Sequence, residues 1–349
     1  MARLLITGGA GFIGANFVHY WLKAHPADRL VVLDALTYAG SLENLEPAQN
    51  SAAFRFVHGN ICDTPLVESL LRYEQLDMIV HFAAESHVDR SISGPDTFIE
   101  TNVVGTHSLL KAARCVWLEE KTVPTHRFHH VSTDEVYGSL GPDDAPFTEE
   151  SPYAPNSPYS ASKAASDHLV RAYHHTYGLS VTISNCSNNY GPHQFPEKLI
   201  PLMITHILKG KALPIYGDGM NVRDWLHVRD HCRAIDLILG RGQVGNVYNI
   251  GGRSERGNMA LVRELCGILD EKFETSPMLR RQFTQSPAAR GRASNSLITF
   301  VTDRPGHDRR YAIDCAKIER ELQFRLDHQL GAALRETVDW YLGRTAIPE

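Results

Sequence analysis

The sequence lacks paired cysteines. Its six cysteines, among 349 residues, are scattered along the chain, and no two of them form a CxxC motif. We therefore expect free thiols in a reducing cytoplasm, and neither a disulfide framework nor a cysteine-based metal site. A long hydrophobic run is lacking as well, because the apolar start MARLLITGGAGFIG meets a glycine turn after a few residues. That run is too short to span a membrane and shows no signal cleavage site, so no membrane association is expected.

An excess of charge of one sign is absent too. The chain has 35 Lys and Arg against 40 Asp and Glu, and 43% of its residues are hydrophobic. This composition is that of an ordinary globular protein and gives no basis for nucleic acid or an anionic membrane as a partner. Histidine is abundant, but His126, His129 and His130 lead into a strand pattern without carboxylates at ligand spacing. We therefore expect no metal.

Short β runs alternate with helical patterns through the first half of the chain. Strands are predicted at 3–7, 30–33, 54–58, 78–82, 127–132 and 180–185, and helices at 11–24, 66–73, 95–114 and 158–177. This alternation is typical of a parallel sheet with helices on both faces. The expected fold class is therefore α/β, a doubly wound Rossmann sheet.

The composition of the sequence changes after residue 186, where Pro, Gly and aromatic residues become more frequent and the predicted elements become shorter. We interpret 1–186 as one domain, with last strands contributed by about 220–252, and 187–349 mainly as a smaller, interleaved α+β domain. Residues 275–296 are rich in Arg, Ser and Pro, and we expect them to form an exposed, basic, flexible insertion.

A glycine-rich turn lies between the first predicted strand and the first predicted helix. The segment TGGAGFIG places Gly8, Gly11 and Gly14 at GxxGxxG spacing. Glycine permits a tight turn and lets backbone N–H groups approach a pyrophosphate at a helix N-terminus. Asp34 ends the second strand, where a carboxylate accepts both ribose hydroxyls and repels a 2′-phosphate. Together these features predict NAD rather than NADP as the cofactor.

Residues that follow or end later strands, and one in the long helix behind them, would extend this cofactor site. They are Asn60, Ile61, Phe82, Ala83, Ala84 and Thr101. Packing alone explains each of these positions as well as cofactor contact does, so both interpretations stay open.

Tyr159 and Lys163 form a YxxxK pair on the predicted helix 158–177. Residues four apart share a helix face, so the ammonium can lower the pKa of the phenol and hold the nicotinamide ribose. The phenolate can then remove a hydroxyl proton near neutral pH. Alone, YxxxK is more often a solvated helix face. The NAD motif, and Thr133 at the end of the preceding strand to hydrogen-bond the same substrate oxygen, make it a candidate catalytic group.

Asp134 and Glu135 follow Thr133 directly, in the segment STDEVYG. Two adjacent carboxylates at the end of a buried strand either cap a helix or act as a general acid and a general base. The second role requires surroundings that drive their pKa values apart.

A family resemblance runs along nearly the whole chain. The segments that carry it are TGGAGFIG, AAESHVDRS, STDEVYG, YSASKAASD, SNNYGP, FPEKLIP, PIYGDG, VRDWLHVRD and RPGHDRRYAID. Through them the sequence resembles the extended short-chain dehydrogenases/reductases, and within these the nucleotide-sugar 4,6-dehydratases that act on dTDP-glucose. The Asp-Glu pair after Thr133 separates the dehydratases from related epimerases. The resemblance implies an NAD-dependent lyase (hydro-lyase) of deoxysugar biosynthesis.

The resemblance also implies a role for each catalytic residue. Tyr159, with Thr133 and Lys163, removes the O4 proton of the nucleotide-sugar while C4 gives a hydride to NAD. Glu135 then takes the C5 proton, and Asp134, as a neutral acid, protonates the departing C6 hydroxyl. The hydride returns to C6, so NAD is regenerated in each turnover and should be held tightly.

Binding residues follow from the same resemblance. The implied NAD contacts are Phe12, Ile13, Asp34, Ala35, Leu36, Thr37, Ala83, Ala84, Ser86, Thr101 and Asn189. The implied substrate contacts are His87, Asn188, Glu197, Lys198, Leu199, Pro214, Tyr216, Arg223, Asn258, Asp303 and His307. Arg223 would contact the diphosphate and Tyr216 would pack on the base. Without the resemblance, VRDWLHVRD around Arg223 would be interpreted as a solvated helix start.

Asn60 departs from the family pattern, which usually has Asp against the adenine. An amide oxygen can still accept from the exocyclic amine, so we expect weakened rather than abolished recognition.

A homodimer is expected, paired through the helices at about 97–115 and 158–177 as in related enzymes. An unpartnered monomer would expose the apolar stripes of both helices. These stripes are Val103, Leu109 and Leu110 on the first helix, and Ala165, Leu169 and Ala172 on the second.

Two other functions remain open at this point. A nucleotide-sugar 4-epimerase would use the same tyrosine and NAD without dehydration, and a non-catalytic NAD-binding regulator would need neither carboxylate. The preferred base is also open, because a 5-methyl group is a packing difference of only about 1–3 kcal/mol.

Overall fold

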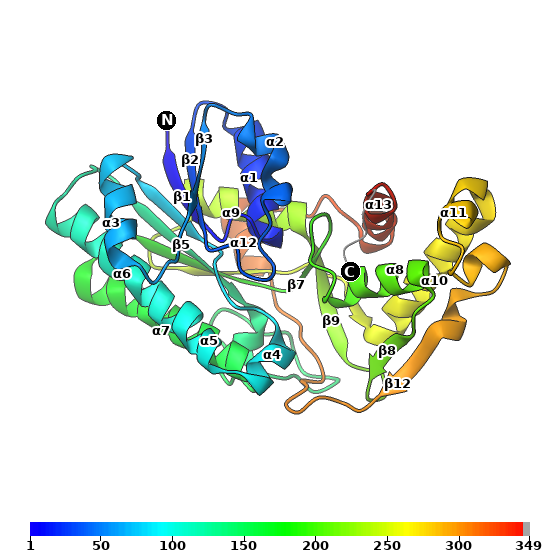
Figure 1. Ribbon diagram of the computed structural model, residues 1–349. Helices are drawn as coiled ribbons and strands as arrows, with labels where there is room; N and C mark the ends of the chain where they lie inside the picture. Colours follow the sequence, from blue (N-terminus) through cyan, green and yellow to red (C-terminus); the bar gives the residue numbers. More distant parts are fainter. Residues whose placement is uncertain (345–349) are drawn as a thin grey trace.

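The computed structural model describes residues 1–344, in which seven parallel strands form a central sheet (Figure 1). Across this sheet the strand order is β10–β6–β5–β4–β1–β2–β3. Its strands are β1 (Arg3–Thr7), β2 (Arg29–Asp34), β3 (Phe54–His58), β4 (Met78–His81), β5 (Arg127–Thr133), β6 (Val181–Cys186) and β10 (Val247–Ile250). The α/β fold class and the six strands predicted before residue 187 are confirmed, with small shifts at their ends.

Helices cover both faces of the central sheet. One face carries α3 (Thr64–Tyr73), α6 (Thr106–Ala113) and α7 (Pro158–Tyr177). The other carries α1 (Phe12–Ala24) and α9 (Val228–Arg241), and α12 (Ala316–Leu322) packs with α9 beside β10. Strands buried on both faces have near-continuous apolar sequences. Examples are LLI in β1, LVVL in β2 and IV in β4.

The strand order reverses beside β1, because the chain proceeds from β1 to β2 and β3 and then returns to β4 on the opposite side. In open parallel sheets, ligands bind outside the carboxyl ends of the strands at such a switch point. The glycine turn after β1 and Thr133 at the end of β5 therefore lie at the same edge of the sheet.

The helix predicted at 95–114 extends further and is irregular. It proceeds through α5 (Asp96–Phe98), a π-helical segment η2 (Ile99–Gly105), α6, and a second π-helical segment η3 (Arg114–Glu119). Leu109 and Leu110, which we expected a monomer to expose, are fully buried against α3 and the sheet. The expectation was wrong for these two residues, because they lie on the face of α6 that packs against α3 and the sheet.

A smaller lobe lies beside the carboxyl edge of the sheet (Figure 1). It contains a three-stranded sheet, β11–β9–β7, and a two-stranded parallel pair, β12–β8. These strands are β7 (Asn188–Tyr190), β8 (Leu213–Tyr216), β9 (Val222–His227), β11 (Glu255–Gly257) and β12 (Ile298–Val301). The helices of the lobe are α8 (Leu199–Lys209), α10 (Asn258–Thr275), α11 (Pro277–Gln282) and α13 (Leu330–Leu342).

Short elements complete the fold. They are η1 (Leu42–Leu45), α2 (Glu46–Gln49), α4 (Val88–Ser93), η4 (Asp134–Tyr137), η5 (Ala288–Arg290) and η6 (Ser294–Leu297).

The stretch 220–252 contributes one strand to the central sheet, not several. β10 pairs with β6, whereas β9 pairs with β7 and β11, because Trp225 of β9 is part of the core of the smaller lobe. VRDWLHVRD is therefore a buried strand followed by a helix, and its interpretation as a solvated helix start is wrong.

The segment 275–296 is folded rather than a loose insertion. α11, η5 and the start of η6 pack against α10, with Leu279 and Ala288 buried in the core of the lobe. Ser294 donates from its hydroxyl to Asp270 at 2.5 Å, and this bond fixes the end of the segment. Its arginines remain on the surface. The apolar residues between them were too few and too widely spaced to indicate this packing.

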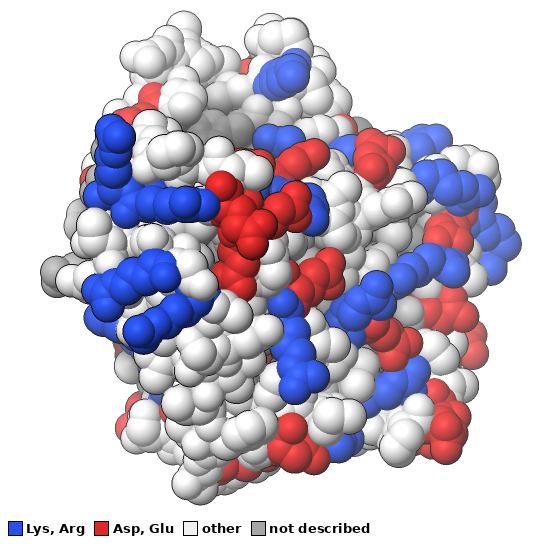
Figure 2. Space-filling view, turned by 90° about the vertical axis from the view of Figure 1, so that its right-hand side faces the viewer, with Lys and Arg blue, Asp and Glu red and all other residues white. Residues whose placement is uncertain are grey.

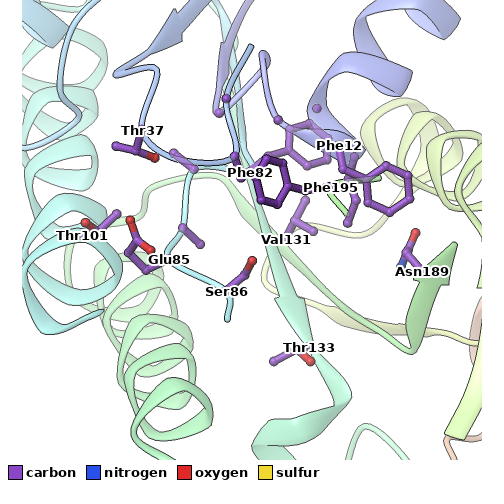
Figure 3. Close-up of a pocket in the computed structure, with 18 of the residues that line it drawn as sticks. Phe12, Thr37, Phe82, Glu85, Ser86, Thr101, Val131, Thr133, Asn189 and Phe195 are labelled. Atoms are coloured by element: carbon purple, nitrogen blue, oxygen red, sulfur yellow. The ribbon is translucent and has the colours of Figure 1, made fainter. Parts of the chain in front are cut away.

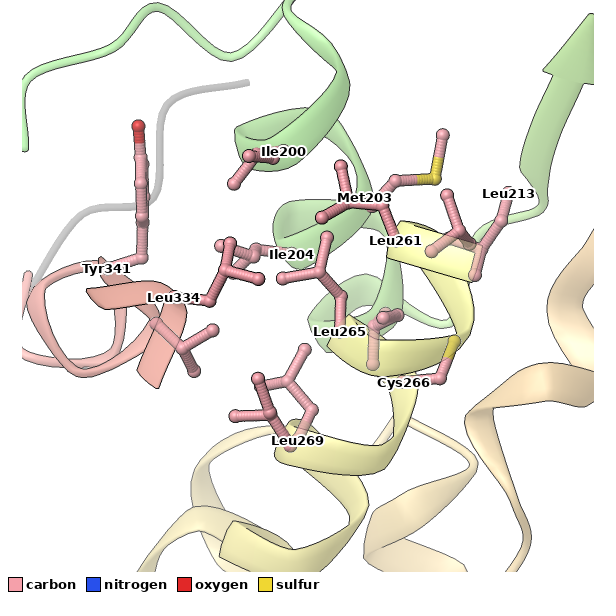
Figure 4. Close-up of a cluster of buried hydrophobic side chains, with 14 of the residues drawn as sticks. Ile200, Met203, Ile204, Leu213, Leu261, Leu265, Cys266, Leu269, Leu334 and Tyr341 are labelled. Carbon is pink, nitrogen blue, oxygen red and sulfur yellow. The ribbon is translucent and has the colours of Figure 1, made fainter. Parts of the chain in front are cut away.

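The core of the smaller lobe is a layer of aliphatic side chains between three helices (Figure 4). α8 contributes Ile200, Met203 and Ile204, α10 contributes Leu261, Leu265 and Leu269, and α13 contributes Leu334. On α10 these leucines recur four residues apart, as expected for one buried helix face.

The surface of this side of the molecule carries charges of both signs. Lys and Arg side chains gather at the left of this face, Asp and Glu gather near its centre, and the two signs are mixed at the right, so no field of one sign covers the face (Figure 2). Among residues 1–344, no helix combines the length and the apolar character needed to cross a bilayer.

Replacing Leu265 with Ala should leave a cavity between α8, α10 and α13, because the leucine is fully buried. We expect the free energy of unfolding to fall by about 2–5 kcal/mol in urea denaturation. Arg263→Ala, at an exposed position of the same helix, is the control and should change it by less than about 0.5 kcal/mol. Equal effects of the two substitutions would contradict this description of the core.

Candidate active site

A cleft of about 310 Å³ lies at the carboxyl ends of β1, β2, β4 and β5 (Figure 3). Both predicted ends of the site, the glycine turn and the Tyr-Lys pair, open into it. The sequence-predicted residues that line the cleft are Gly8, Gly11, Phe12, Ile13, Gly14, Asp34, Ala35, Thr37, Asn60, Ile61, Phe82, Ala83, Ala84, Ser86, Thr101, Thr133, Asp134, Glu135, Tyr159, Lys163, Asn188, Asn189, Glu197 and Lys198.

The glycine turn is packed too closely for side chains. Gly8 has a φ of +69°, and a Cβ atom built there would lie 2.6 Å from the backbone nitrogen of Ala83. A Cβ atom at Gly14 would lie 2.2 Å from the carbonyl oxygen of Gly8. The turn therefore presents bare backbone to the cleft at the start of α1, which is the arrangement that a pyrophosphate requires.

Asp34 is held at the end of β2 by two backbone donors. Its carboxylate accepts from the N–H of Ala10 at 2.9 Å and from that of Leu36 at 2.8 Å. Burial raises the pKa of Asp34, while both hydrogen bonds lower it. Each carboxylate oxygen keeps a free lone pair, so the group can still accept two ribose hydroxyls. Leu36 does not line the cleft, because its side chain packs against the core beneath α1.

The Tyr-Lys pair lies in the first two turns of α7, which begins with a strong cap. Ser157 and Ser160 form a reciprocal capping box, and Pro158 occupies the first turn. The Nζ atom of Lys163 donates to the carbonyl oxygen of Val131 at 2.9 Å. Burial lowers the pKa of Lys163 to about 8.

The pKa of Tyr159 is raised well above its ordinary value, mainly by burial and then by the carboxylate of Glu135. A hydrogen bond with Thr133 works in the opposite direction. Burial therefore dominates the pKa of the phenol among the groups of the chain, and its lowering by Lys163 stays a prediction.

Asp134 is buried and Glu135 is partly buried beside the cleft, and their neighbours differ. Burial, Glu135 and Asp224 raise the pKa of Asp134 well above its usual range, so this side chain is favoured as the neutral acid. Burial also raises the pKa of Glu135, but three cations oppose the rise. These are Arg304, Arg223 and Lys198.

Helix capping does not explain these carboxylates. The turn η4 that contains them is capped by Thr133, whose hydroxyl oxygen accepts from the N–H of Glu135 at 3.3 Å. The Oδ2 atom of Asp134 is buried without a hydrogen-bond partner within residues 1–344. A buried acidic oxygen without a partner points to a ligand that it would contact.

The side of the cleft formed by the smaller lobe brings together several predicted substrate residues. Glu197 lies 3.6 Å from the Nε2 atom of His87, and Lys198 donates to the carbonyl oxygen of Ser86 at 2.8 Å. The Oε1 atom of Glu197 and the Oδ1 atom of Asn188 are buried and have no partner in the described chain. They are available to hydroxyl or amide donors of a ligand.

The remaining predicted substrate residues do not line the cleft. They are His87, Leu199, Pro214, Tyr216, Arg223, Asn258, Asp303 and His307. Three of them form a separate group, in which the rings of Tyr216 and His307 meet at 6.2 Å and His307 contacts Asp303 at 2.6 Å. Asp89 of α4 joins this group to the lobe that contains the central sheet, because its carboxylate accepts from the Tyr216 hydroxyl at 3.1 Å.

Local hydrogen bonds explain the positions of two residues singled out in the sequence, Asn60 and His129. The side-chain oxygen of Asn60 accepts from the N–H of Cys62 at 2.9 Å, which turns Asn60 along the edge of the cleft. His129 contacts Thr182 and Ser184 at 2.9 and 3.1 Å, so its ring completes a buried network.

Sequence reasoning missed part of the lining. The additional residues are Leu33, Tyr38, Ala39, Gly40, Gly59, Glu85, Val131, Ser132, Cys186, Ser187, Gln194 and Phe195. Most adjoin predicted positions, and the aromatic side chains of Tyr38 and Phe195 carry no chemical signal of their own. Arg304 was also missed, although it begins the segment RPGHDRRYAID, which contains the predicted residue His307.

The residues present fit a bound NAD. The bare glycine turn, the Asp34 carboxylate and the unpartnered amide oxygen of Asn188 are placed along one continuous cleft that ends at Tyr159.

Comparison with known proteins gives one consistent result. The family model described as GDP-mannose 4,6 dehydratase matches residues 5–337. The dTDP-glucose 4,6-dehydratase of Xanthomonas campestris pv. campestris (strain B100) is 55% identical over 98% of this chain and 93% of its own length. That of Salmonella typhimurium is 50% identical over the same shares of the two chains.

Solved structures agree with the sequence relatives. The dTDP-glucose 4,6-dehydratase of Streptomyces venezuelae, crystallised with NAD bound, is 50% identical, has a TM-score of 0.85, and is matched over 97% of each chain. The UDP-glucuronic acid 4-epimerase of Bacillus cereus has the same fold with a TM-score of 0.81, but only 25% identity. The chain belongs to the family of nucleotide-sugar 4,6-dehydratases, and within it to the dTDP-glucose 4,6-dehydratases.

Proposed function

We propose that the protein binds NAD and dehydrates dTDP-glucose to the 4-keto-6-deoxy sugar. One observation carries this proposal: two adjacent carboxylates, the buried Asp134 and the partly buried Glu135, whose neighbours favour opposite protonation states beside Tyr159. An epimerase has no use for an acid and a base at these two positions. The proposal agrees with what the relatives named above are said to catalyse.

The residues of the chain would divide the proton transfers as follows. When bound, NAD supplies the hydride acceptor for C4 and the hydride donor for C6. Tyr159 takes the O4 proton, with Thr133 as its hydrogen-bond partner and Lys163 one turn further along α7. Glu135 takes the C5 proton, which the neighbouring 4-ketone makes acidic, and Asp134 gives its proton to the departing C6 hydroxyl.

We further infer that residues 187–349 mainly bind the nucleotide part of the substrate, whereas 1–186 bind NAD. The group of Tyr216, Asp303 and His307 supports this division, because it offers an aromatic face and polar side chains beyond the catalytic end of the cleft. Pro214, Leu199 and Asn258 border the same lobe and complete the proposed nucleotide site. Arg223 is buried and stacked on Tyr311 at 4.3 Å, so its positive charge is fixed in place.

The proposed substrate is tested by turnover with dTDP-, UDP-, CDP- and GDP-glucose. The expected product from dTDP-glucose is a 4-keto-6-deoxy sugar, which absorbs in alkali. A C4 epimer that does not absorb would instead favour the epimerase alternative.

Glu135→Gln should separate oxidation from elimination. The amide cannot take the C5 proton, so we expect turnover to fall by about 10²–10⁴-fold. Reduced nicotinamide should still form when substrate is added, while exchange of the C5 hydrogen with deuterated solvent should stop. Glu149→Gln is the matched control, since Glu149 is a partly buried carboxylate outside the cleft. Unchanged turnover in Glu135→Gln, or a loss shared with the control, would contradict the role assigned to Glu135.

The pH profile of kcat/KM should be bell-shaped. Activity requires ionised Glu135 and protonated Asp134, so it falls at low pH as Glu135 gains a proton and at high pH as Asp134 loses one. Because burial raises the pKa of Glu135, the acid limb should lie above the ordinary glutamate value of about 4.3. In Asp134→Asn the acid limb should stay, and any alkaline limb should follow Lys163, whose pKa is about 8. An acid limb at the ordinary value would count against the burial of the working base.

We also propose a cytoplasmic homodimer that pairs through the helix over residues 96–119 and α7. Ile99 and Val104 are about half exposed, at 49% and 50%, which leaves apolar surface on the first helix. Ala172 adds a small exposed side chain on α7. Sedimentation at micromolar concentration should give twice the chain mass of 39.0 kDa, and Ala172→Glu should shift the protein towards the monomer. Sedimentation of the unaltered protein as a monomer would contradict this proposal.

A further inference from the structure

Three segments that are far apart in the sequence meet at the edge of the cleft. They follow β2, form α4, and precede α8, and each contributes one side chain to a common contact. The guanidinium of Arg90 lies over the ring of Tyr38, 3.8 Å from the ring centroid. The same guanidinium forms an ion pair with Glu197 at 3.2 Å. Arg90 thus joins the loop after Asp34 to the smaller lobe.

Other contacts join the same three segments. The ring of Tyr38 meets that of Phe195 edge-on, with centroids 5.7 Å apart and an interplanar angle of 87°. Lys198 donates to the carbonyl oxygen of Ser86 at 2.8 Å. Burial, with Glu197 and Glu85 close by, raises the pKa of Tyr38, so its phenol stays neutral in this contact.

These side chains form part of the wall of the proposed NAD site. Tyr38, Ser86, Phe195 and Glu197 line the same cleft as the glycine turn and Tyr159. Figure 3 shows Phe195 beside Phe12 and Phe82, across from Ser86. The glycine turn and the sheet edge form the floor of this cleft, whereas the contacts around Tyr38 connect its two sides. These contacts therefore connect side chains of the cleft wall to both lobes.

We propose that Arg90, stacked on Tyr38 and paired with Glu197, is a positioning residue that holds the cleft closed over NAD and slows its release. We call the three residues the clasp. The inference rests on the proposed NAD site, but it does not depend on which sugar the enzyme converts. A retained cofactor suits a reaction in which the hydride returns to the product, because nothing is gained by exchanging NAD between turnovers.

The partial exposure of the Arg90–Glu197 ion pair suits a contact that opens rarely rather than a permanent one. The side chain of Arg90 is 49% exposed and that of Glu197 is 14% exposed. A half-exposed arginine contributes through stacking and through an ion pair that water partly screens. Together these contributions correspond to roughly a 5- to 30-fold change in how often the clasp is open.

The test measures retention of NAD in the absence of any sugar. Each purified protein is saturated with NAD, separated rapidly from the excess, and sampled over time for NAD that has left the protein. Arg90→Ala should release NAD roughly 5- to 30-fold faster than the unaltered protein. Arg90→Lys should release it at an intermediate rate, since lysine keeps the charge opposite Glu197 but not the planar face over Tyr38. Tyr38→Leu, which keeps apolar volume, should match Arg90→Ala.

Arg344→Ala is the matched control. Arg344 lies over the ring of Trp340 at 4.7 Å and within 3.7 Å of Glu43, so it also pairs an aromatic ring with a carboxylate across the two lobes. It does not line the cleft. The control should release NAD at the rate of the unaltered protein.

Two outcomes would overturn the proposal. One is unchanged release from Arg90→Ala and Tyr38→Leu. The other is equal acceleration by Arg344→Ala, which would indicate a general loosening of the two lobes. If Arg90→Ala does not fold, Arg90→Lys and Tyr38→Leu decide the question alone. Failure of the dehydration assay would not affect this result, and normal turnover with fast NAD release would support the clasp while leaving the chemistry intact.

Discussion

The burial of one carboxylate and the partial burial of its neighbour are the constraint on which the active site depends. Burial disfavours the charged form of both Asp134 and Glu135, and the charge of Glu135 further disfavours that of Asp134. Ionising both groups of such a pair costs free energy, so one proton is shared unequally between the two groups. Arg223 lowers the pKa of both groups, whereas Arg304 and Lys198 act on Glu135 and the carboxylate of Asp224 acts on Asp134, and this difference favours the proton on Asp134. An acid and a base thus arise from adjacent residues of one turn.

The origin of those charges explains why the site needs both lobes. Asp134 and Glu135 follow β5 of the central sheet, whereas Arg223 lies on β9 and Arg304 follows β12. Lys198 precedes α8, also in the smaller lobe. The electrostatic difference between the two carboxylates therefore depends on how the lobes pack. Arg90 and Asp89, on α4, join the same two lobes through Glu197 and Tyr216, so contacts that hold the cleft closed also keep the cations in place.

The central sheet was predictable because its signals are local. Alternating apolar runs and helical patterns indicated the strands from β1 to β6, and TGGAGFIG with Asp34 indicated the switch point. The course of the chain after residue 186 was less predictable, since β9 and β10 both show short apolar runs, and their different sheets are set by tertiary contacts of Trp225 and Tyr248. The burial of Leu109 was missed because only the packing of α6 against α3 shows which face of that helix meets the core. Arg90 and Tyr38 were missed for a similar reason, since only the fold brings residues 38, 90 and 197 together.

The electrostatics of Tyr159 connects cofactor retention with chemistry. Among the groups of the chain, burial and Glu135 raise the pKa of this phenol, and the hydrogen bond with Thr133 is too weak to reverse that effect. The ammonium of Lys163 is turned towards the carbonyl oxygen of Val131. A further positive charge in the cleft would lower the pKa of this phenol, and the nicotinamide ring of NAD⁺ carries one. An enzyme with this arrangement would lose the proton acceptor for O4 together with the hydride acceptor for C4 whenever NAD departed. Holding the cofactor through many turnovers keeps both functions available to each new substrate.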